Sequence, residues 1–360
     1  MEVATTFIPA AQPSPASKTR VGLQAPRLSV VIVNYHQWEN TAALVKQLRT
    51  SQVMRQCQGE ILIVDNHSPR HRISRMLRRC PNVSLLRWGR NRGFARAVNE
   101  GCRLSQGEWV LLLNPDMSLP DDFLDRLLAM TDLLTITEPR TGILGFGLRN
   151  RDGSPQLSAG FFPTLGSTLL GHLLPRAQRK YHAFPLDRRS EADWVTGCCL
   201  LIRRECLEEL GGLDQDFFLY YEDVDLCRRA RKLGWQVQYE PRLWATHFDP
   251  LHNRQTPTAL KVVLRHSLLT YARKHWPRWQ FRFLSGLAKA EALTKRCLNG
   301  LLRRGRAVSL LTELLHIISD LRQGNCRKAR NRLRALTRKE CFASRTPGHS
   351  VPENKRDERK

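Results

Sequence analysis

The sequence has no apolar run long enough to cross a membrane, and its ten cysteines include no C-x-x-C pair. A membrane-spanning helix needs about 20 predominantly apolar residues, so we expect no transmembrane segment. The first residues do not combine a basic end with a compact apolar stretch, as a secretory signal does. Scattered cysteines without such a signal are typical of reduced thiols, and we therefore expect a cytoplasmic protein.

Acidic residues are also scarce. Asp and Glu number 33 against 58 Lys and Arg, which gives a formal net charge of +25. The imbalance is concentrated near the C-terminus, because residues 261–360 hold 25 Lys and Arg and 7 Asp and Glu, a net charge of +18. Such a surplus favours an anionic partner: a phosphate-bearing substrate, nucleic acid or an anionic membrane surface. A function of the N-terminal region has to be inferred from its motifs instead.

Composition divides the 360 residues into four predicted regions. We expect a disordered leader at 1–27, which is rich in Pro, Ala and Ser, and a disordered polar tail at 346–360. Between them we predict an α/β catalytic domain at 28–255 and a basic helical extension at 256–345. A hydrophobic fraction of 41% is enough for most of the chain to fold around a core.

Three short runs rich in Val, Ile and Leu, at 28–34, 60–65 and 109–113, predict strands that are buried on both faces of a parallel sheet. Helical patterns separate them, which is the order of a doubly wound α/β sheet. Shorter strands are expected at 143–146, 198–202, 236–239 and 243–247, and helices at 204–210, 223–233, from 258 onward, 283–302 and 307–321.

Polar residues follow each of the three main strands, at Asn34-Tyr35, Asp65-Asn66 and 114–116. Because ligands of open α/β sheets bind at the carboxyl ends of the strands, these residues together predict a site at that edge. The turn preferences of Asn, Asp and Pro explain any one of them equally well.

Six motifs occur along the chain in the order in which one enzyme family has them. They are Val31-Ile-Val-Asn-Tyr35, Val64-Asp-Asn-His-Ser68, the segment from Asn91 to Gly101, Leu111-Leu-Leu-Asn-Pro-Asp116, Thr196-Gly-Cys-Cys-Leu-Leu-Ile202 and the segment from Phe217 to Asp225. On these residues the chain resembles the family-two inverting glycosyltransferases of the GT-A fold, in their rhamnosyltransferase-like branch. The resemblance extends from about Leu28 to Pro277. It implies a Rossmann-like, mostly parallel sheet with helices on both faces and a nucleotide-sugar donor.

The resemblance also implies a divalent metal, Mg²⁺ or Mn²⁺, on the donor diphosphate. Asp116 matches the metal-binding aspartate of the family, whose D-x-D-like element is Asn114-Pro115-Asp116 here. His247 matches a second ligand, although the Gly that usually follows it is Phe248 in this chain. A turn or capping role is the alternative for Asp116, and His252 is a nearby competitor for the histidine position.

The nucleotide side of the site is expected at Asn34, Tyr35, Asp65, Asn91 and Gly93, together with Asn114 and Asp116. By resemblance, Asp65 accepts a hydrogen bond from the base, and the N3–H of uracil or thymine suits UDP and dTDP donors alike. The resemblance also makes dTDP-rhamnose the first expectation and UDP-hexoses the second. Gly93 allows close backbone approach at a helix start, where anions bind readily. Helix capping by Asn91 is the alternative interpretation of its position.

Inversion at the anomeric carbon needs one base that deprotonates the acceptor hydroxyl. By resemblance that base is Asp223, and Glu222 orients it or the acceptor. The alternative is that both carboxylates stabilise the start of the following helix through its dipole. Trp194, Thr196 and Gly197 match the loop that lines the acceptor side in the family, and a glycan or lipid-linked molecule is the expected acceptor.

The basic extension beyond Phe281 lies outside the resemblance. Its Leu-lined helices with Arg and Lys clusters are typical of interfacial helices, so we expect a peripheral position on the inner face of the cytoplasmic membrane. A solvated helix bundle is the alternative. A nucleotidyltransferase is disfavoured because Asn34-Tyr35-His36-Gln37 replaces a Gly-rich phosphate loop. A nucleic-acid-binding protein and a non-catalytic nucleotide-sugar-binding GT-A protein stay open as alternatives.

Overall fold

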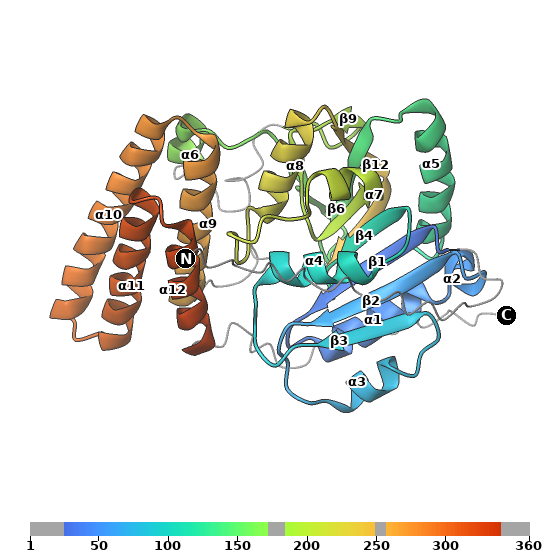
Figure 1. Ribbon diagram of the computed structural model, residues 1–360, viewed down its shortest axis with the longest axis horizontal. Helices are drawn as coiled ribbons and strands as arrows, with labels where there is room; N and C mark the ends of the chain where they lie inside the picture. The colour runs from blue at the N-terminus through green and yellow to red at the C-terminus, as the bar shows by residue number, and fades with distance from the viewer. Residues whose placement is uncertain (1–24, 172–183, 249–256, 340–360) are drawn as a thin grey trace, which may run out of the picture.

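The computed structural model describes residues 25–171, 184–248 and 257–339 (Figure 1). The predicted leader lies almost entirely outside these residues, and the predicted tail lies wholly outside them. The structure consists of a central, mostly parallel sheet with helices on both faces and a group of C-terminal helices beside it. This arrangement confirms the predicted fold class.

The central sheet has the strand order β3-β2-β1-β4-β11-β6-β12-β5. Its parallel half is formed by β1 (Leu28–Asn34), β2 (Gly59–Asp65), β3 (Val83–Arg87) and β4 (Trp109–Leu113). Its mixed half is formed by β11 (Cys199–Arg203), β6 (Thr141–Arg149), β12 (Gln236–His247) and β5 (Met117–Ser118). Four short strands complete the set: β7 (Pro155–Gln156) on β6, β9 (Ser190–Glu191) on β12, and β8 (Ala159–Gly160) paired with β10 (Trp194–Val195).

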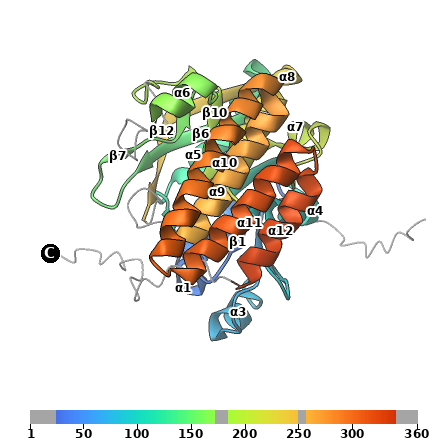
Figure 2. The same ribbon diagram turned by 90° about the vertical axis from the view of Figure 1, so that its left-hand side faces the viewer.

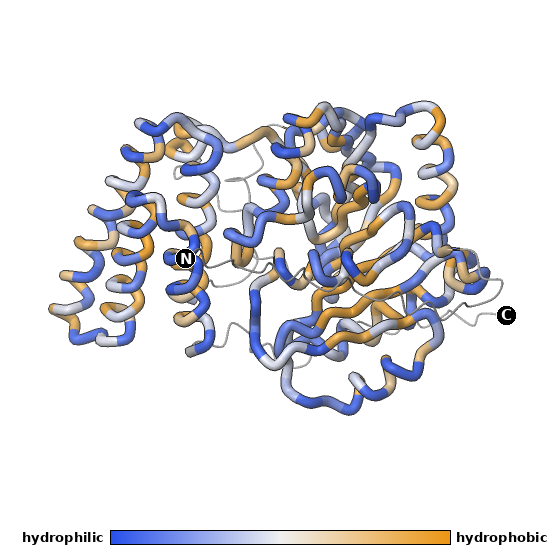
Figure 3. The backbone as a smooth tube through the Cα atoms, in the orientation of Figure 1, coloured by the Kyte–Doolittle hydropathy of each residue, from blue (hydrophilic) through white to orange (hydrophobic). Residues whose placement is uncertain are grey.

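Every residue of β1 is buried, because the strand is covered on both faces. Val31 and Val33 pack into the hydrophobic cluster under α4 (Phe94–Leu104) and α8 (Glu222–Lys232). Val30 and Ile32 pack into a second cluster, under α1 (Trp38–Leu48) and α5 (Phe123–Thr137). Figure 3 shows the resulting apolar strands at the centre of the sheet. Smaller helices lie at the periphery: α2 (Gln52–Arg55), α3 (Arg72–Leu77), α6 (Leu165–Leu170) and α7 (Arg204–Glu209).

The C-terminal region is helical, as expected, with α9 (Thr258–His275), α10 (Arg278–Leu301), α11 (Gly305–Arg322) and α12 (Cys326–Lys339). These helices lie side by side, next to the sheet (Figures 1 and 2). Their buried residues, such as Leu269, Ile317 and Leu333, belong to the same hydrophobic cluster as α4 and α8. The helices therefore share a core with one face of the sheet.

Two strands expected at 236–239 and 243–247 are one strand, β12. Its register against β6 shifts between Glu240 and Trp244, and Pro241 lies in that interval. A proline has no N–H to donate to a ladder, so the sequence interrupts the pairing without ending the strand. The basic run that begins at Arg327 forms α12, within the extension at 256–345 that was predicted to be helical.

Candidate functional site

The carboxyl ends of β1 and β2 are joined through their polar side chains. Asn34 and Asp65 are register partners, and the Asn34 amide donates to Asp65 Oδ1 at 2.9 Å and to Ser68 Oγ at 3.0 Å. Asn34 Oδ1 in turn accepts from the Thr41 hydroxyl at 2.9 Å. Tyr35 follows at the strand end, half-buried, with its ring edge-on to the ring of His36. The predicted polar edge is therefore a connected network.

Asp65 is fully buried within this network. Arg87 Nε donates to Asp65 Oδ2 at 2.9 Å, and the Ser68 backbone N–H donates to Oδ1 at 3.1 Å. A carboxylate offers about four lone-pair directions, and with Asn34 three of them are used by the protein. The structure thus gives Asp65 a role in fixing the loop at 66–69, and its expected contact with the nucleotide base stays a prediction.

Asn91 and Gly93 shape the turn that leads into α4. Asn91 Oδ1 accepts from the Gly93 backbone N–H and from the Asn66 amide, both at 2.9 Å. The residue before the helix is Gly93, so Asn91 forms the turn and is not itself the N-cap. Gly93 has a φ of 92°, and a Cβ there would meet Phe218 at 2.9 Å. Only glycine permits this close approach of the two loops.

Asp116 and His247 meet at the end of the mixed half of the sheet, because β5 and β12 are antiparallel neighbours. Asp116 Oδ2 lies 3.4 Å from His247 Nε2, and both side chains are largely buried. Asn114, by contrast, is half-buried. Among the residues that the structure describes, no cluster of three or more His, Cys, Asp or Glu side chains is suited to a metal ion. A metal here therefore needs further ligands from substrate or water.

Gln156, which no pattern in the sequence singled out, contacts the imidazole of His247. Its side-chain nitrogen lies 3.0 Å from His247 Nδ1, while its buried Oε1 has no hydrogen-bond partner among the described residues. With the amide in this orientation its nitrogen donates to Nδ1, and the proton of a neutral imidazole lies on Nε2, facing Asp116. With the amide turned over, its oxygen accepts from Nδ1–H, and Nε2 has the lone pair that a metal ligand needs. In both arrangements Gln156 orients the ring.

Glu222 and Asp223 begin α8, and both are largely buried. Asp223 Oδ2 accepts from the Gly197 backbone N–H at 3.1 Å, and Oδ1 accepts from the Val224 backbone N–H at 2.9 Å. Tyr220 and Tyr221, directly before them, both have left-handed backbone, with φ of 70° and 67°. Such strain in non-glycine residues is concentrated at functional sites. Both the catalytic and the helix-dipole interpretation of this pair are compatible with the geometry.

The loop from Thr196 to Cys198 connects the two halves of the site. The Asn114 backbone N–H donates to Cys198 O at 2.9 Å, and the Gly197 backbone N–H contacts Asp223. The Thr196 backbone N–H donates to Ser158 O at 2.8 Å. Trp194 is fully buried, and its indole N–H donates to Phe161 O at 2.9 Å, so it anchors the chain directly before this loop. The turn at 114–116 and the start of α8 therefore lie on either side of one short loop.

Asp225, one turn into α8, ties this segment to α9. It lies 2.7 Å from His275 Nε2 and 2.8 Å from Arg229 Nε, and its side chain is 1% exposed. Burial raises the pKa of Asp225, but the hydrogen bonds from His275 and Arg229 and the charge of Arg229 together outweigh it, so the pKa is lowered. Asp225 belongs to one of the six motifs, but nothing in the sequence identified its partner.

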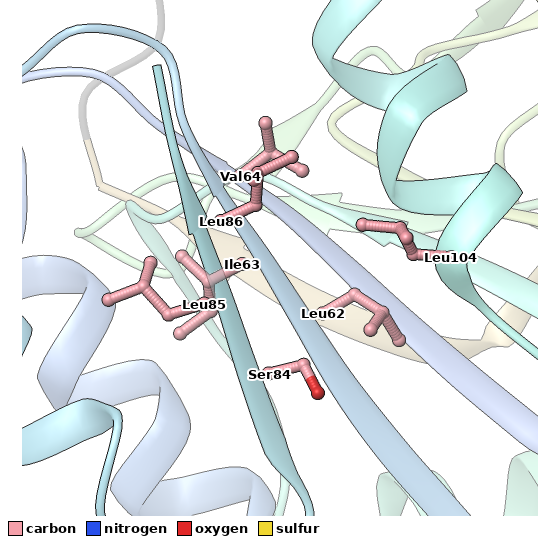
Figure 4. A pocket seen from close by; sticks show the side chains of 7 residues that line it. All are labelled: Leu62, Ile63, Val64, Ser84, Leu85, Leu86 and Leu104. Carbon is pink, nitrogen blue, oxygen red and sulfur yellow. The ribbon is translucent and has the colours of Figure 1, made fainter. Parts of the chain in front are cut away.

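A separate hollow of about 230 Å³ lies between β2, β3 and the end of α4 (Figure 4). Its lining is almost wholly apolar, consisting of Leu62, Ile63, Val64, Ser84, Leu85, Leu86 and Leu104. Ser84 contributes the one hydroxyl, which is too little to bind a nucleotide diphosphate. None of the predicted site residues lines it.

The sequence profile described as glycosyltransferase like family 2 matches residues 26–268. The chain is 31% identical over 241 residues to an N-acetylglucosaminyl-diphospho-decaprenol L-rhamnosyltransferase of Mycobacterium tuberculosis, covering 61% of this chain and 76% of that protein. It is 28% identical over 246 residues to the low-salt glycan biosynthesis hexosyltransferase Agl10 of Haloferax volcanii, covering 66% and 72%. The protein is a glycosyltransferase, and it belongs to family 2.

Among solved structures, the mannosyltransferase PcManGT from Pyrobaculum calidifontis, in complex with GDP-Man and Mn²⁺, has a TM-score of 0.47 and 17% identity. The match covers 89% of this chain and 88% of that one. A likeness of this strength supports no further argument. Within the part of the chain that the structure describes, no helix is long and apolar enough to cross a bilayer.

Proposed function

We propose that this family-2 enzyme is an inverting hexosyltransferase. It moves a sugar from a nucleotide diphosphate donor, dTDP-rhamnose or a UDP-sugar, to a glycan or lipid-linked acceptor. The relative from Mycobacterium tuberculosis, whose name describes rhamnosyl transfer to a diphospho-decaprenol-linked sugar, supports this donor and acceptor class. The product would enter the synthesis of a cell-envelope polysaccharide.

One observation carries the proposal. The Asn114–Asp116 turn and the Asp223 carboxylate are both hydrogen-bonded to the loop at 197–198, through Asn114 to Cys198 and Gly197 to Asp223. Leaving-group stabilisation and deprotonation of the nucleophile have to occur on opposite sides of one anomeric carbon. The turn that carries Asp116 and the Asp223 carboxylate are held by the same short loop, which fits that requirement.

Asp223 is the proposed base. Its two oxygens each accept one backbone N–H, which orients the carboxylate. As the hydroxyl oxygen bonds to the anomeric carbon, its proton passes to Asp223 and the diphosphate leaves with the electron pair of the broken C–O bond. Glu222, adjacent and buried, is placed to orient the acceptor.

Asp116 and His247 are the proposed ligands of Mg²⁺ or Mn²⁺. Asp116 Oδ2 and His247 Nε2 are 3.4 Å apart, so one ion can contact both, and Gln156 orients the His247 ring through Nδ1. When bound, a divalent cation supplies Lewis-acid stabilisation of the departing diphosphate. Asp116 supplies the hard oxygen ligand that either metal prefers.

We also propose that the enzyme works as a peripheral protein on an anionic membrane surface. α10 exposes an apolar stripe at helical spacing, which consists of Trp279, Phe283, Leu287, Leu298 and Leu301. Basic side chains flank this stripe, among them Arg278, Arg282, Lys289 and Arg296. Apolar burial combined with attraction to anionic headgroups is the usual basis of interfacial binding. A lipid-linked acceptor would be reached at that surface.

The test is the thermal stability of the purified protein with a panel of dTDP-, UDP- and GDP-sugars, with and without Mn²⁺ or Mg²⁺. A donor that binds the native state raises the melting temperature, and we expect the largest metal-dependent rise with dTDP-rhamnose or a UDP-hexose. A folded protein that gives no shift with any donor would contradict the proposal and favour a non-catalytic role.

A further inference from the structure

Arginines from two distant parts of the chain converge beside the start of α4. Arg90, Arg92 and Arg96 come from the turn before α4 and its first residues, and Arg330 and Arg334 come from α12. These residues are called the arginine cluster below. Figure 2 shows α12 next to α4. Arg334 and Arg92 are 242 positions apart in the sequence, and a hydrogen bond from the Arg334 guanidinium to the Arg92 backbone O joins them.

Specific contacts hold the arginine cluster in place. Arg334 Nη2 donates to the backbone O of Arg92 at 3.4 Å, and Arg330 Nη1 donates to the backbone O of Gln215 at 3.2 Å. Arg96 Nε donates to the side-chain oxygen of the same Gln215 at 2.7 Å. The side chains of the arginine cluster are therefore fixed by hydrogen bonds among α4, α12 and the segment around residue 215.

The arginine cluster adjoins the proposed active site. The Arg92 backbone N–H donates to Asn66 Oδ1 at 2.8 Å, on the polar edge of the sheet. The next residue, Gly93, packs against Phe218, and Phe94 N donates to Phe218 O at 2.7 Å. Phe218 lies in the segment that leads directly to Glu222 and Asp223. A ligand of the cluster would consequently lie beside the substrates.

The carboxylates near the arginine cluster do not balance its charge. Asp216 is shared between Arg330 at 3.1 Å and Lys274 at 2.9 Å. Asp214 pairs with Lys274 at 2.8 Å, and Glu100 pairs with Arg103 at 2.8 Å. Each of these acids is already occupied by a basic partner, so the cluster retains a surplus of positive charge.

Three of the guanidinium groups also have one donor atom without an acceptor. The Nε atoms of Arg92, Arg330 and Arg334 are buried, and none of them has a hydrogen-bond partner among the described residues. Burial, followed by the charges of Arg330, Arg96 and Arg90, lowers the pKa of Arg334 to about 10. The pKa of Arg96 is lowered for the same two reasons. Mutual repulsion and unmet donors are both relieved by a bound anion.

The donor geometry selects the kind of anion. A guanidinium presents parallel N–H groups that match the oxygens of phosphate, often in a bidentate pair. α4 adds the positive end of its dipole at the same place. Arg90 is exposed, and Arg96, Arg330 and Arg334 are partly exposed, so an anion has access from solvent. Several guanidinium groups suit a diphosphate better than a single carboxylate.

We propose that the arginine cluster binds a phosphoryl anion, and that this anion is the phosphate or diphosphate of the acceptor. The assignment to the acceptor rests on the proposed function. The donor diphosphate is the other source of the same chemistry. We favour the acceptor because Arg330 and Arg334 lie beyond residue 268, where the match to the family ends, whereas the proposed donor-binding motifs lie within it.

The first experiment measures binding of inorganic diphosphate by isothermal titration calorimetry on the full chain, with a chelator present to exclude metal binding. Arg330→Gln/Arg334→Gln should raise the dissociation constant about tenfold or more, because charged hydrogen bonds are lost. Arg327→Gln/Arg338→Gln removes the same charge from exposed positions of the same helix. It should change the dissociation constant for diphosphate by less than about twofold. Arg330→Lys/Arg334→Lys keeps the charge and should recover part of the loss.

The second experiment identifies the source of the anion. Steady-state kinetics of the glutamine double variant should show a KM for a phosphate-linked sugar acceptor that is raised about tenfold, with the KM for the donor unchanged. A rise in the donor KM instead would overturn the assignment to the acceptor. Equal diphosphate binding by the wild type and both double variants would overturn the anion site itself. If the wild type shows no turnover but the glutamine double variant loses diphosphate binding, the proposed function is refuted and the anion site is supported.

Discussion

The sheet edge and the C-terminal helices use charge in opposite ways. At the sheet edge, Asn34, Asp65 and Asp223 are buried and hydrogen-bonded to neighbours, so each group is held in one orientation. In the helices, most Lys and Arg side chains are exposed, and residues 261–360 have a net charge of +18. Fixed polar groups suit chemistry at one bond, whereas exposed cations suit attraction of an extended anionic surface.

The same contrast holds for apolar side chains. The strands of the sheet bury nearly all of theirs, while α10 exposes large ones along its length, including Trp279 and Leu301. α12 lies between these extremes, because it turns Arg330 and Arg334 toward Gln215 and Arg92 and keeps Arg327 and Arg338 in solvent. Under the proposed function, catalysis and membrane binding belong to different regions, which meet at the arginine cluster.

Asp223→Asn tests the catalytic side of this contrast and should have the largest effect. Loss of a positioned base lowers kcat by about 10²- to 10⁴-fold. The melting-temperature shift given by the donor should persist, because the amide keeps the shape of the side chain. Asp121→Asn, at an exposed position before α5, is the matched control and should retain activity. Near-normal turnover of Asp223→Asn would remove Asp223 from the role of base.

Asp225→Asn tests the junction between the two regions. Replacing one partner of a buried ion pair leaves Arg229 and His275 without their counter-charge, so we expect a loss of about 3 kcal/mol in the free energy of unfolding. Urea denaturation of the two proteins measures it. A loss below about 0.5 kcal/mol would show that the pair contributes no more than an exposed one.

The pH dependence gives a second measure of Asp225. Its pKa in the folded state is below the ordinary value of 3.8, so the stabilisation is fully present above about pH 3.8 and is lost as the pH falls from there through the folded-state pKa. The melting temperature of the wild type should therefore drop more steeply below about pH 4 than that of Asp225→Asn. Parallel curves for the two proteins would contradict the assignment.

The sequence predicted the sheet edge well because parallel strands buried on both faces leave continuous apolar runs. The polar residues after β1, β2 and β4 then follow from topology alone. The pairing of Asp116 with His247 was approached only through family resemblance, since the neighbourhood of β5 and β12 is a long-range contact. Gln156 was missed because β7 has two residues, too few for any periodic pattern.

The helices were predicted less completely. The extension at 256–345 was predicted to be helical, but no separate helix was assigned beyond 321. Ala329, Leu333 and Leu336 are fully or largely buried at spacings typical of one helix face, which delimits α12. The spacing does not identify the partner, because contact with α4 depends on how the preceding helices pack. The inward direction of Arg330 and Arg334 was therefore outside the reach of the sequence.

Gln156→Leu removes a side chain that acts on the proposed metal site only through His247. Without the amide, the His247 imidazole loses its hydrogen bond at Nδ1, and affinity for Mn²⁺ should fall about 10- to 100-fold. Gln156→Glu keeps an acceptor and should retain most of the affinity. Gln106→Leu, at an exposed position, serves as the control in the same calorimetric titration. Unchanged Mn²⁺ affinity in Gln156→Leu would separate Gln156 from the metal site.

The smallest expected effect compares exposed apolar residues in the two regions. Phe283 on α10 is 49% exposed, and Ile136 on α5 is 81% exposed. If only α10 faces the membrane, Phe283→Ser should weaken binding to anionic vesicles by about 1 kcal/mol, since a half-exposed ring gains part of its burial energy in lipid. Ile136→Ser should leave binding unchanged, although it removes the more exposed side chain. Vesicle co-sedimentation at low salt measures both. Equal effects of the two substitutions, or wild-type protein that stays in the supernatant, would erase the distinction between a catalytic region and a membrane-binding one.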